Sequence, residues 1–435
     1  MQNSIWAESS RLPKFDSLKG DIKTDVLIVG GGIAGILCAY RLHQSGIDYT
    51  LIEADTIADG VTRNTTAKIT SQHGLIYSKI LKSVGEEKAY LYWEANENAI
   101  ENYRILSKTV DCDFEIKDNY IYTVSCKKKI ENELKALEKL NIPSEFTTKT
   151  ELPFSIGGAV KFKNQAQFNP YKFIKGIVSN LNIYEHTRAV EFMGNTVITE
   201  HGKIFAQNII IATHFPIINK HGEYFLKMYQ HRSYVTAVKN AANLNGMYLC
   251  ESENCLSFRS YDNFLLIGGG GHRTGKHSNS WSDTDAFINK YYQNSEIYCK
   301  WATQDCMTLD GIPYIGRYGR RTHNLYVATG FNKWGMTSSM VAASLLTNII
   351  KGKDDPLIQV FSPSRTLLRK QLIINGFEAT TNLLNFTKPR CPHLGCALKW
   401  NSIERSWDCP CHGSRFSENG ELLDNPSTDN IKLKD

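Results

Sequence analysis

The chain has no long hydrophobic run and no concentrated block of charge of one sign. Nowhere in its 435 residues is there a stretch of the roughly 18 apolar residues that a membrane-spanning helix requires. The net charge of +6 is spread along the chain, and the largest basic run covers only residues 127–129. The N-terminal residues also lack the apolar centre of a signal peptide. We therefore expect no membrane span, no nucleic-acid partner and a cytoplasmic location.

Paired cysteine spacing is missing from most of the sequence. The scattered cysteines are Cys38, Cys112, Cys126, Cys250, Cys255, Cys299 and Cys306. This scatter is typical of free thiols in a reducing compartment. The other four of the 11 cysteines fall between residues 391 and 411. With 42% hydrophobic and 22% charged residues, the composition is that of a soluble globular protein of two or three domains.

The N-terminal region carries a dinucleotide-binding pattern. An apolar run over residues 25–29 predicts a strand, residues 36–45 predict a helix, and residues 49–52 predict a second strand. Between the first strand and the helix stands Gly-x-Gly-x-x-Gly, made by Gly30, Gly32 and Gly35, and the second strand ends at Glu53. Such glycines allow a tight turn, approach of the backbone to a pyrophosphate and close packing of helix on strand, while the acid accepts hydrogen bonds from a ribose. The pattern predicts a bound dinucleotide but does not choose between NAD and FAD.

Later segments favour FAD. Residues 208–213 (NIIIAT) and 324–331 (NLYVATGF) are buried-strand runs, the second leads into an apolar helix over residues 337–350, and residues 310–316 read DGIPYIG. In this order, the segments resemble the FAD-dependent D-amino-acid oxidase and glycine oxidase family over nearly all of residues 20–355. The resemblance implies a discontinuous flavin domain with the last strand and helix beside the isoalloxazine ring.

The resemblance also implies which residues contact FAD. They are Gly30, Gly32, Ile33, Ala34, Gly35, Glu53, Ala54, Asn64, Thr65, Thr66, Lys68, Val190, Ala212, Thr213, Asp310, Gly330, Phe331, Gly335, Met336 and Thr337. The segment 59–73 that supplies four of them also fits an ordinary exposed polar loop. Some relatives attach FAD through a cysteine about seven residues before the aspartate that corresponds to Asp310. Thr303 occupies that position here and Cys306 lies only four residues before Asp310, so we expect non-covalent FAD.

A second sheet should hold the substrate. The catalytic candidates are Arg232, Tyr234, His272 and Lys333. An arginine, either Arg232 or the alternative Arg273, could hold a substrate carboxylate by two parallel hydrogen bonds. For each candidate, a structural or surface role fits the sequence at least as well as a catalytic role.

Two short motifs near the C-terminus, CPHLGC at residues 391–396 and CPCHGS at 409–414, contain six Cys and His residues. Zinc also takes Cys and His at short spacing, but six positions exceed its four ligands. The motifs resemble the paired loops of a Rieske [2Fe–2S] centre. The resemblance implies that Cys391 and Cys409 hold one iron, that His393 and His412 hold the other, and that Cys396 and Cys411 form a disulfide.

This Rieske-like part departs from its family in two ways. Only residues 387–390 separate the preceding apparent helix from Cys391, so the usual base strands are absent, and we expect the flavoprotein to support the loops. Ser414 matches a hydroxyl that bonds the cluster sulfurs, whereas Phe416 replaces a tyrosine with the same function. Loss of that hydrogen bond should lower the reduction potential.

The predicted architecture is α/β. It comprises a Rossmann-like FAD-binding domain of the D-amino-acid oxidase type, an antiparallel-sheet substrate domain and a small all-β cluster-binding subdomain. The expected bounds are 1–20 for a leader, 21–107, 161–220 and 301–355 for the FAD domain, 108–160 and 221–300 for the substrate domain, 356–386 for a helical linker, and 387–435 for the cluster part.

Three functions fit this combination. The first is a dehydrogenase that oxidises an amine or amino acid at FAD and sends electrons through the cluster to an external one-electron carrier. The second is a reductase that runs electrons from a ferredoxin-like donor through the cluster to FAD, and redox potentials would distinguish it from the first. The third is a redox-sensing or structural module, for which we expect a filled flavin face in place of a cavity. We favour the first.

Overall fold

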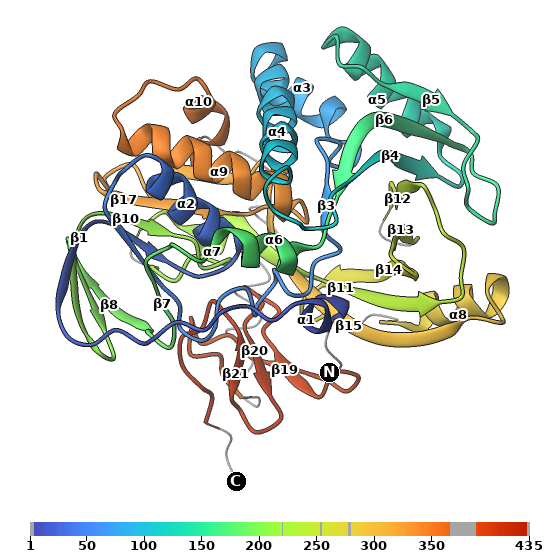
Figure 1. Cartoon of the computed structure of the whole chain (residues 1–435). Coiled ribbons are helices and arrows are strands. Elements are labelled where there is room, and N and C mark those ends of the chain that lie inside the picture. The colour runs from blue at the N-terminus through green and yellow to red at the C-terminus, as the bar shows by residue number, and fades with distance from the viewer. Residues whose placement is uncertain (1–3, 220, 253–254, 277–279, 366–388, 433–435) are drawn as a thin grey trace.

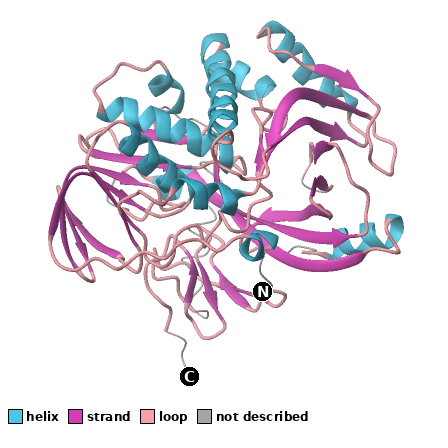
Figure 2. Ribbon diagram, in the orientation of Figure 1, coloured by secondary structure: helices cyan, strands magenta, loops and turns pink. Residues whose placement is uncertain are grey.

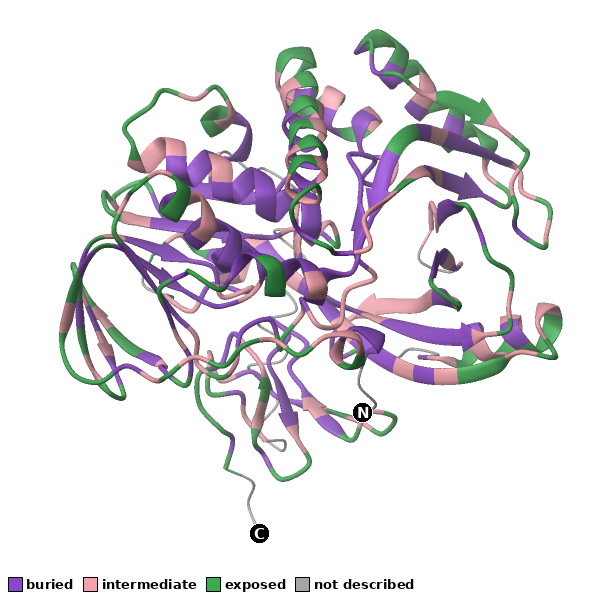
Figure 3. Cartoon of the chain, viewed as in Figure 1, coloured by how far each residue is buried: buried purple, intermediate pink, exposed green. Residues whose placement is uncertain are grey.

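Two large β-sheets and one small one organise the chain (Figure 2). The structure is a computed structural model and describes residues 4–219, 221–252, 255–276, 280–365 and 389–432. Buried residues concentrate along the large sheets and the helices packed on them, whereas solvent-exposed residues lie on outer helix faces and turns (Figure 3). The architecture is the predicted α/β type.

The first sheet is the predicted dinucleotide-binding sheet. Its strand order is β16-β17-β10-β1-β2-β7, with β9 and β8 attached beside β10. The strands are β1 (Ile22–Val29), β2 (Tyr49–Ile52), β7 (Ile183–Tyr184), β8 (Ala189–Met193), β9 (Thr196–Thr199), β10 (Gly202–Ile211), β16 (Tyr314–Arg317) and β17 (Leu325–Thr329). The central strands run parallel, so their carboxyl ends meet at one edge. Helices α2 (Ile33–Gln44) and α9 (Gly335–Ile350) lie side by side on one face of this sheet (Figure 1).

The second sheet has the strand order β15-β11-β14-β13-β12-β4-β6-β3, with β5 beside β6. Its strands are β3 (Lys68–Ile69), β4 (Glu115–Thr123), β5 (Glu145–Thr147), β6 (Gly158–Gln167), β11 (Met228–Lys239), β12 (Gly246–Cys250), β13 (Ser257–Tyr261), β14 (Phe264–Arg273) and β15 (Glu296–Thr308). Neighbours are antiparallel except β12 and β4, which run parallel. The sheet continues beyond the expected bounds of 160 and 300, because β6 and β15 are long strands that extend to residues 167 and 308.

The remaining helices frame the two sheets. They are α1 (Ile5–Ser9), α3 (Tyr77–Val84), α4 (Glu86–Leu106), α5 (Lys127–Lys139), α6 (Pro170–Ile177), α7 (Tyr224–Lys227), α8 (Ser282–Tyr291) and α10 (Leu357–Phe361). In the described part of the chain, no helix has the length and apolar content to span a membrane. The predicted leader is built into the core, because Trp6 is fully buried and donates its indole N–H to the carbonyl of Thr65 at 2.7 Å. The predicted linker begins with α10, and its residues 366–386 lie outside the described residues.

The C-terminal part forms a small antiparallel sheet of β18 (Lys399–Asn401), β19 (Ser406–Asp408), β20 (Arg415–Ser417) and β21 (Leu422–Asp424). The first cysteine-containing motif precedes β18, and the second connects β19 to β20. In Figure 1 this sheet, coloured red, lies beneath the place where the two large sheets meet. The small sheet and its two motifs contact both large sheets, because Gln230 on β11 bonds His412 and Asn425, next to β21, bonds Phe215, which follows β10.

Candidate active site

The glycine motif folds as its sequence predicts. Gly30 has φ +112°, and a Cβ atom there would lie 2.6 Å from the carbonyl oxygen of Ala212. A Cβ atom on Gly35 would overlap the carbonyl oxygen of Gly30, so close helix–strand packing requires glycine. The carboxylate of Glu53 accepts a hydrogen bond from the backbone N–H of Gly31 at 2.6 Å, and burial raises its pKa. This geometry fits the pyrophosphate and ribose of a dinucleotide.

A cavity of about 1250 Å³ extends from this motif to the second sheet. It is lined by sixteen of the residues predicted at the cofactor: Gly30, Gly32, Ile33, Ala34, Glu53, Ala54, Thr65, Thr66, Lys68, Val190, Ala212, Thr213, Gly330, Phe331, Gly335 and Met336. Lys68 is buried in this wall, and the burial lowers its pKa to about 7. The structure thus brings the predicted polar segment and the two strand ends to one space large enough for a dinucleotide and a small substrate.

Three other predicted cofactor residues stand outside the cavity wall and make internal contacts. The carboxylate of Asp310 pairs with the guanidinium of Arg365 at 2.7 Å. The hydroxyl of Thr337 lies 3.0 Å from the imidazole of His73, and the side chain of Asn64 bonds within its own turn. Through these contacts the three residues support the cavity wall without lining it. Gly35 likewise acts through packing.

Two of the four catalytic candidates bind the C-terminal part of the chain. Arg232 donates from Nε to Glu404 at 2.9 Å and forms a buried ion pair with the same carboxylate. Tyr234 lines the cavity as predicted, and its hydroxyl also donates to Glu404 at 2.9 Å. The predicted substrate role of Arg232 is replaced by an interdomain contact, because Glu404 occupies the fork that a substrate carboxylate would need. His272 stacks on Tyr234 and does not line the cavity, and burial lowers its pKa.

Lys333 lines the cavity together with Asp305, which the sequence did not single out. Asp305 on β15 lies opposite His231 on β11 in the strand register. A Cβ atom on Gly271 would lie 2.9 Å from the imidazole of His231 and 3.6 Å from Lys333 Nζ, so these two side chains approach the same glycine. Burial raises the pKa of Asp305 to about 6, although the nearby Lys333 and Arg232 oppose this shift. Strand alternation, which places residues 303 and 305 on one face, is the signal that could have identified this carboxyl.

The two histidines of the C-terminal motifs are arranged as metal ligands would be. His393 and His412 meet edge to face with ring centroids 4.9 Å apart. Among the described side chains, each has a buried Nδ1 atom without a hydrogen-bond partner. Burial lowers the pKa of His393 to about 4 and that of His412 to about 3, so both rings are neutral at neutral pH. Neutral imidazoles with unpaired nitrogens are what iron ligation requires.

Four sulfurs converge beside these rings. The Sγ atoms of Cys396, Cys409 and Cys411 lie within 4.8 Å of one another, and Cys391 packs in the same buried cluster. All four cysteines are buried. Cysteine sulfurs and two free imidazole nitrogens fit a [2Fe–2S] cluster held by Cys391, Cys409, His393 and His412.

One disulfide of the structure was not expected from the sequence. The Sγ atoms of Cys396 and Cys411 lie within 4.8 Å of each other, and the disulfide predicted between them stays a prediction. The structure joins Cys250 to Cys255, two cysteines that were expected to be scattered free thiols. That expectation was wrong for this pair because the connection between β12 and β13 brings their Cα atoms to 5.7 Å, a separation that suits a disulfide.

The second cluster motif is held by the flavoprotein sheet. The amide of Gln230 on β11 donates to the carbonyl of His412 at 2.9 Å, and that of Gln304 on β15 donates to Gly413 at 2.8 Å. A Cβ atom on Gly413 would lie 2.5 Å from the Gln230 side chain, so the contact is tight. These bonds supply the support that the sequence led us to expect from the flavoprotein in place of base strands.

The histidines of the two motifs face the segment that follows β10. Phe215 has its ring centroid 6.3 Å from that of His393 and 6.4 Å from that of His412. It stands two residues after Thr213, which lines the cavity. His393 Nε2 also bonds the side chain of Asn219 at 2.9 Å. A short run of chain therefore connects the cavity wall to the two histidines.

Comparison with known proteins agrees with this geometry. The family described as FAD dependent oxidoreductase matches residues 25–349, and the Rieske [2Fe-2S] domain family matches residues 363–434. The Bacillus subtilis (strain 168) protein YhfW, named as a Rieske 2Fe-2S iron-sulfur protein, is 34% identical over 99% of this chain and 97% of its own. That alignment spans 495 positions, more than the 435 residues here, so the relative carries residues without a counterpart.

Two further matches cover the flavoprotein. Gamma-glutamylputrescine oxidoreductase of Escherichia coli (strain K12) is 22% identical over 80% of this chain and 88% of its own. The structure of glycine oxidase from Geobacillus kaustophilus superimposes with a TM-score of 0.68 and 16% identity, over 79% of this chain and 99% of that one. The second likeness shows a shared fold.

Proposed function

Because the chain belongs to the FAD-dependent oxidoreductase family and carries a Rieske [2Fe–2S] domain, we propose that it oxidises an amine or amino acid and passes the electrons through the cluster to an external one-electron carrier. FAD when bound accepts two electrons together, whereas the cluster carries one at a time. The proposed enzyme is thus a dehydrogenase that converts a two-electron oxidation into single-electron steps. Its FAD is non-covalent.

The contact between Phe215 and the two ligand histidines carries this proposal. Thr213 lines the flavin cavity, and the side chain of Asn425, next to β21, donates to the carbonyl of Phe215 at 3.1 Å. The cluster's histidine side thus packs on the segment that continues from the cavity wall. Such an arrangement supports electron transfer within one chain without movement of the cluster domain.

The second sheet supplies groups for an amine or amino-acid substrate. Lys333 can attract a carboxylate, and Asp305, whose pKa is raised to about 6, can take up or hold a proton on the substrate nitrogen. The names of two relatives, glycine oxidase and gamma-glutamylputrescine oxidoreductase, point to the same substrate class. We assign Lys333 to binding and Asp305 to proton transfer. Arg232 and Tyr234 hold the cluster domain, and His272 supports Tyr234.

The cavity continues past the dinucleotide motif to Asp305 and Lys333, which favours turnover over a sensing or purely structural module, because a module without a substrate needs only the space that FAD itself fills. The reductase alternative uses the same contacts in the opposite direction. Potentiometric titration separates the two: a cluster potential above that of FAD favours the dehydrogenase, and one below it favours the reductase.

The experiment is an anaerobic screen of amino acids and amines with protein that holds both FAD and cluster. A substrate should bleach the flavin absorbance, and Lys333→Met should raise the KM for substrates that carry a carboxylate. The matched control is Lys351→Met, an exposed position just after α9 and away from the cavity wall, which should leave the KM unchanged. No bleaching with any amine or amino acid would contradict the proposed substrate class.

A further inference from the structure

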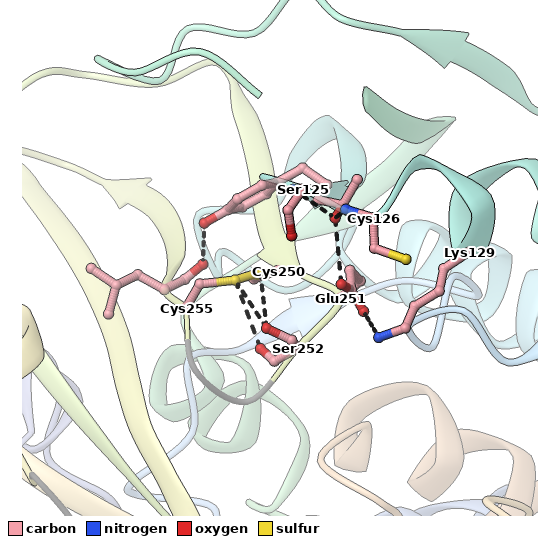
Figure 4. Close-up of a disulfide and its surroundings, with 10 residues drawn as sticks. Ser125, Cys126, Lys129, Cys250, Glu251, Ser252 and Cys255 are labelled. Carbon is pink, nitrogen blue, oxygen red and sulfur yellow. Dashed lines mark hydrogen bonds and ion pairs between the residues drawn. A yellow bond between two sulfur atoms is a disulfide. The ribbon is translucent and has the colours of Figure 1, made fainter. Parts of the chain in front are cut away.

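The Cys250–Cys255 disulfide closes the connection between two strands of the substrate sheet. Cys250 is the last residue of β12, and Cys255 lies two residues before β13 begins. Figure 4 shows the two sulfurs bonded, with Ser252 beside them and Glu251 directed toward Lys129. The bond closes a very short loop, so it restricts the unfolded chain much less than a long-range disulfide would. Stabilisation of the fold is therefore a weak reason for its presence.

Both cysteines open into the flavin cavity. Cys250 and Cys255 line the same continuous space as Gly30 at the dinucleotide motif and Phe331 near the start of α9. Each is half-buried, so the bond is accessible from within the cavity. An accessible disulfide is more readily reduced than one sealed in a core.

The surroundings of the pair suit reversible opening. The hydroxyl of Ser252 lies 3.5 Å from the Sγ atom of Cys255 and 3.8 Å from that of Cys250, so it can hydrogen-bond either sulfur after the bond opens. Both flanking strands are held independently of the disulfide. The hydroxyl of Tyr122 donates to the carbonyl of Leu256 at 2.6 Å, and the backbone N–H of Glu251 donates to the carbonyl of Tyr122 at 2.9 Å.

The side chain of Glu251 is also tied away from the sulfurs. Its carboxylate pairs with Lys129 at 2.7 Å and accepts a hydrogen bond from Thr123 at 3.4 Å. A negative charge next to a sulfur would oppose formation of a thiolate, and this pairing with Lys129 reduces that opposition. The sulfur–sulfur bond can therefore break while the two flanking strands stay in place.

We propose that Cys250 and Cys255 form a reversible dithiol–disulfide couple that exchanges two electrons with the flavin in this cavity. When the bound flavin is reduced, two electrons and two protons pass to the disulfide, the sulfur–sulfur bond breaks, two thiols form and the flavin is reoxidised. The reverse step returns the electrons to oxidised flavin. This inference rests on the proposed function only in requiring bound FAD, not in requiring an amine substrate.

Thiol trapping after photochemical reduction tests the couple without a substrate. The loaded protein is photoreduced anaerobically, denatured in an alkylating reagent, digested and analysed by mass spectrometry. The expected result is that Cys250 and Cys255 are both intact as a disulfide before illumination and both alkylated afterwards. A disulfide that persists while the flavin is fully reduced would overturn the proposal, as would alkylation of both cysteines before illumination.

Two controls separate the flavin and the cysteine pair from the rest of the protein. Protein stripped of FAD and illuminated with the same photoreductant should keep the disulfide, and its loss there would overturn the role of the flavin. In reductive titrations, the Cys250→Ser/Cys255→Ser double variant should take up two electrons fewer per chain than the unaltered protein. The matched variant Cys126→Ser, which alters a nearby free cysteine outside the cavity, should take up the same number as the unaltered protein. Equal uptake by the double variant and the unaltered protein would contradict the couple, whether or not any amine is oxidised.

Discussion

Replacement of Glu404 by Gln should release the cluster domain from the flavoprotein. The side chain of Glu404 has no exposed surface and accepts hydrogen bonds from Arg232, Tyr234 and Arg415. Burial alone would raise the pKa of Glu404, but Arg232 and Arg415 outweigh it and lower the pKa from 4.5 to about 2. That lowering corresponds to roughly 3 kcal/mol in favour of the charged carboxylate. Removal of one partner from a buried ion pair costs a similar amount, about 3–5 kcal/mol.

The assay follows the visible circular dichroism of the cluster during denaturation by urea, with flavin fluorescence recorded on the same samples. Glu404→Gln should lose about 3 kcal/mol of stability in the cluster transition. The matched variant Glu418→Gln, which breaks an exposed pair with Arg405 in the same small sheet, should lose less than about 1 kcal/mol. Equal cluster stability in the two variants would refute the assignment of Glu404 as the main contact.

The pH dependence gives a second measure of the same group. Because the folded-state pKa of Glu404 is lowered, its contribution is fully present above its ordinary value of 4.5 and is lost as the pH falls toward 2. The difference in stability between the unaltered protein and Glu404→Gln should therefore shrink below pH 4.5. A difference that stays constant down to pH 2 would contradict this linkage.

Three further predictions concern the flavoprotein. Asp305→Asn should remove an ionisation near pH 6 from the pH profile of kcat/KM, because the raised pKa of Asp305 makes the carboxylate form available only above that pH; an unchanged profile would exclude this residue. Gly30→Ala should abolish FAD binding, because its Cβ atom would lie 2.6 Å from the Ala212 carbonyl oxygen. Flavin absorbance after gel filtration measures this, and retained FAD would contradict the requirement for glycine at this turn. Truncation after Lys388 should leave a protein with native far-ultraviolet circular dichroism, whereas residues 388–435 expressed alone should bind no cluster, because Gln230 and Gln304 hold the second motif; a stable cluster in the fragment would show that it needs no such support.

The flavin half of the fold could be predicted because each local signal agrees with its neighbours. The buried strand at residues 25–29, the glycine motif and Glu53 occur in the order that a parallel sheet requires, and the structure places them accordingly. The two later strand segments were also identified, because buried parallel strands are continuous apolar runs. The cluster motifs were predicted because both resemble the paired loops of a Rieske centre.

The contacts between distant segments could not be predicted from periodicity. Arg232 on β11 was assigned to a substrate, but its partner Glu404 lies 172 residues later in the chain. A single sequence carries no signal that joins those two positions. Cys250 and Cys255 were similarly overlooked, because only the fold shows that they meet. Asp305 was missed although Thr303 and Cys306 beside it were considered. Those two residues were examined only for covalent attachment of FAD, and the side chains on the cavity-facing side of the strand were not examined for acid–base chemistry.

The most direct test of electron transfer from flavin to cluster is electron paramagnetic resonance on the loaded protein after anaerobic addition of a substrate found in the screen. The cluster is silent when oxidised and gives a signal with one added electron. A Rieske signal should appear as the flavin bleaches and should be absent from His412→Ala protein that retains FAD. Complete bleaching of the flavin with no reduced-cluster signal in the unaltered protein would contradict transfer of electrons from flavin to cluster.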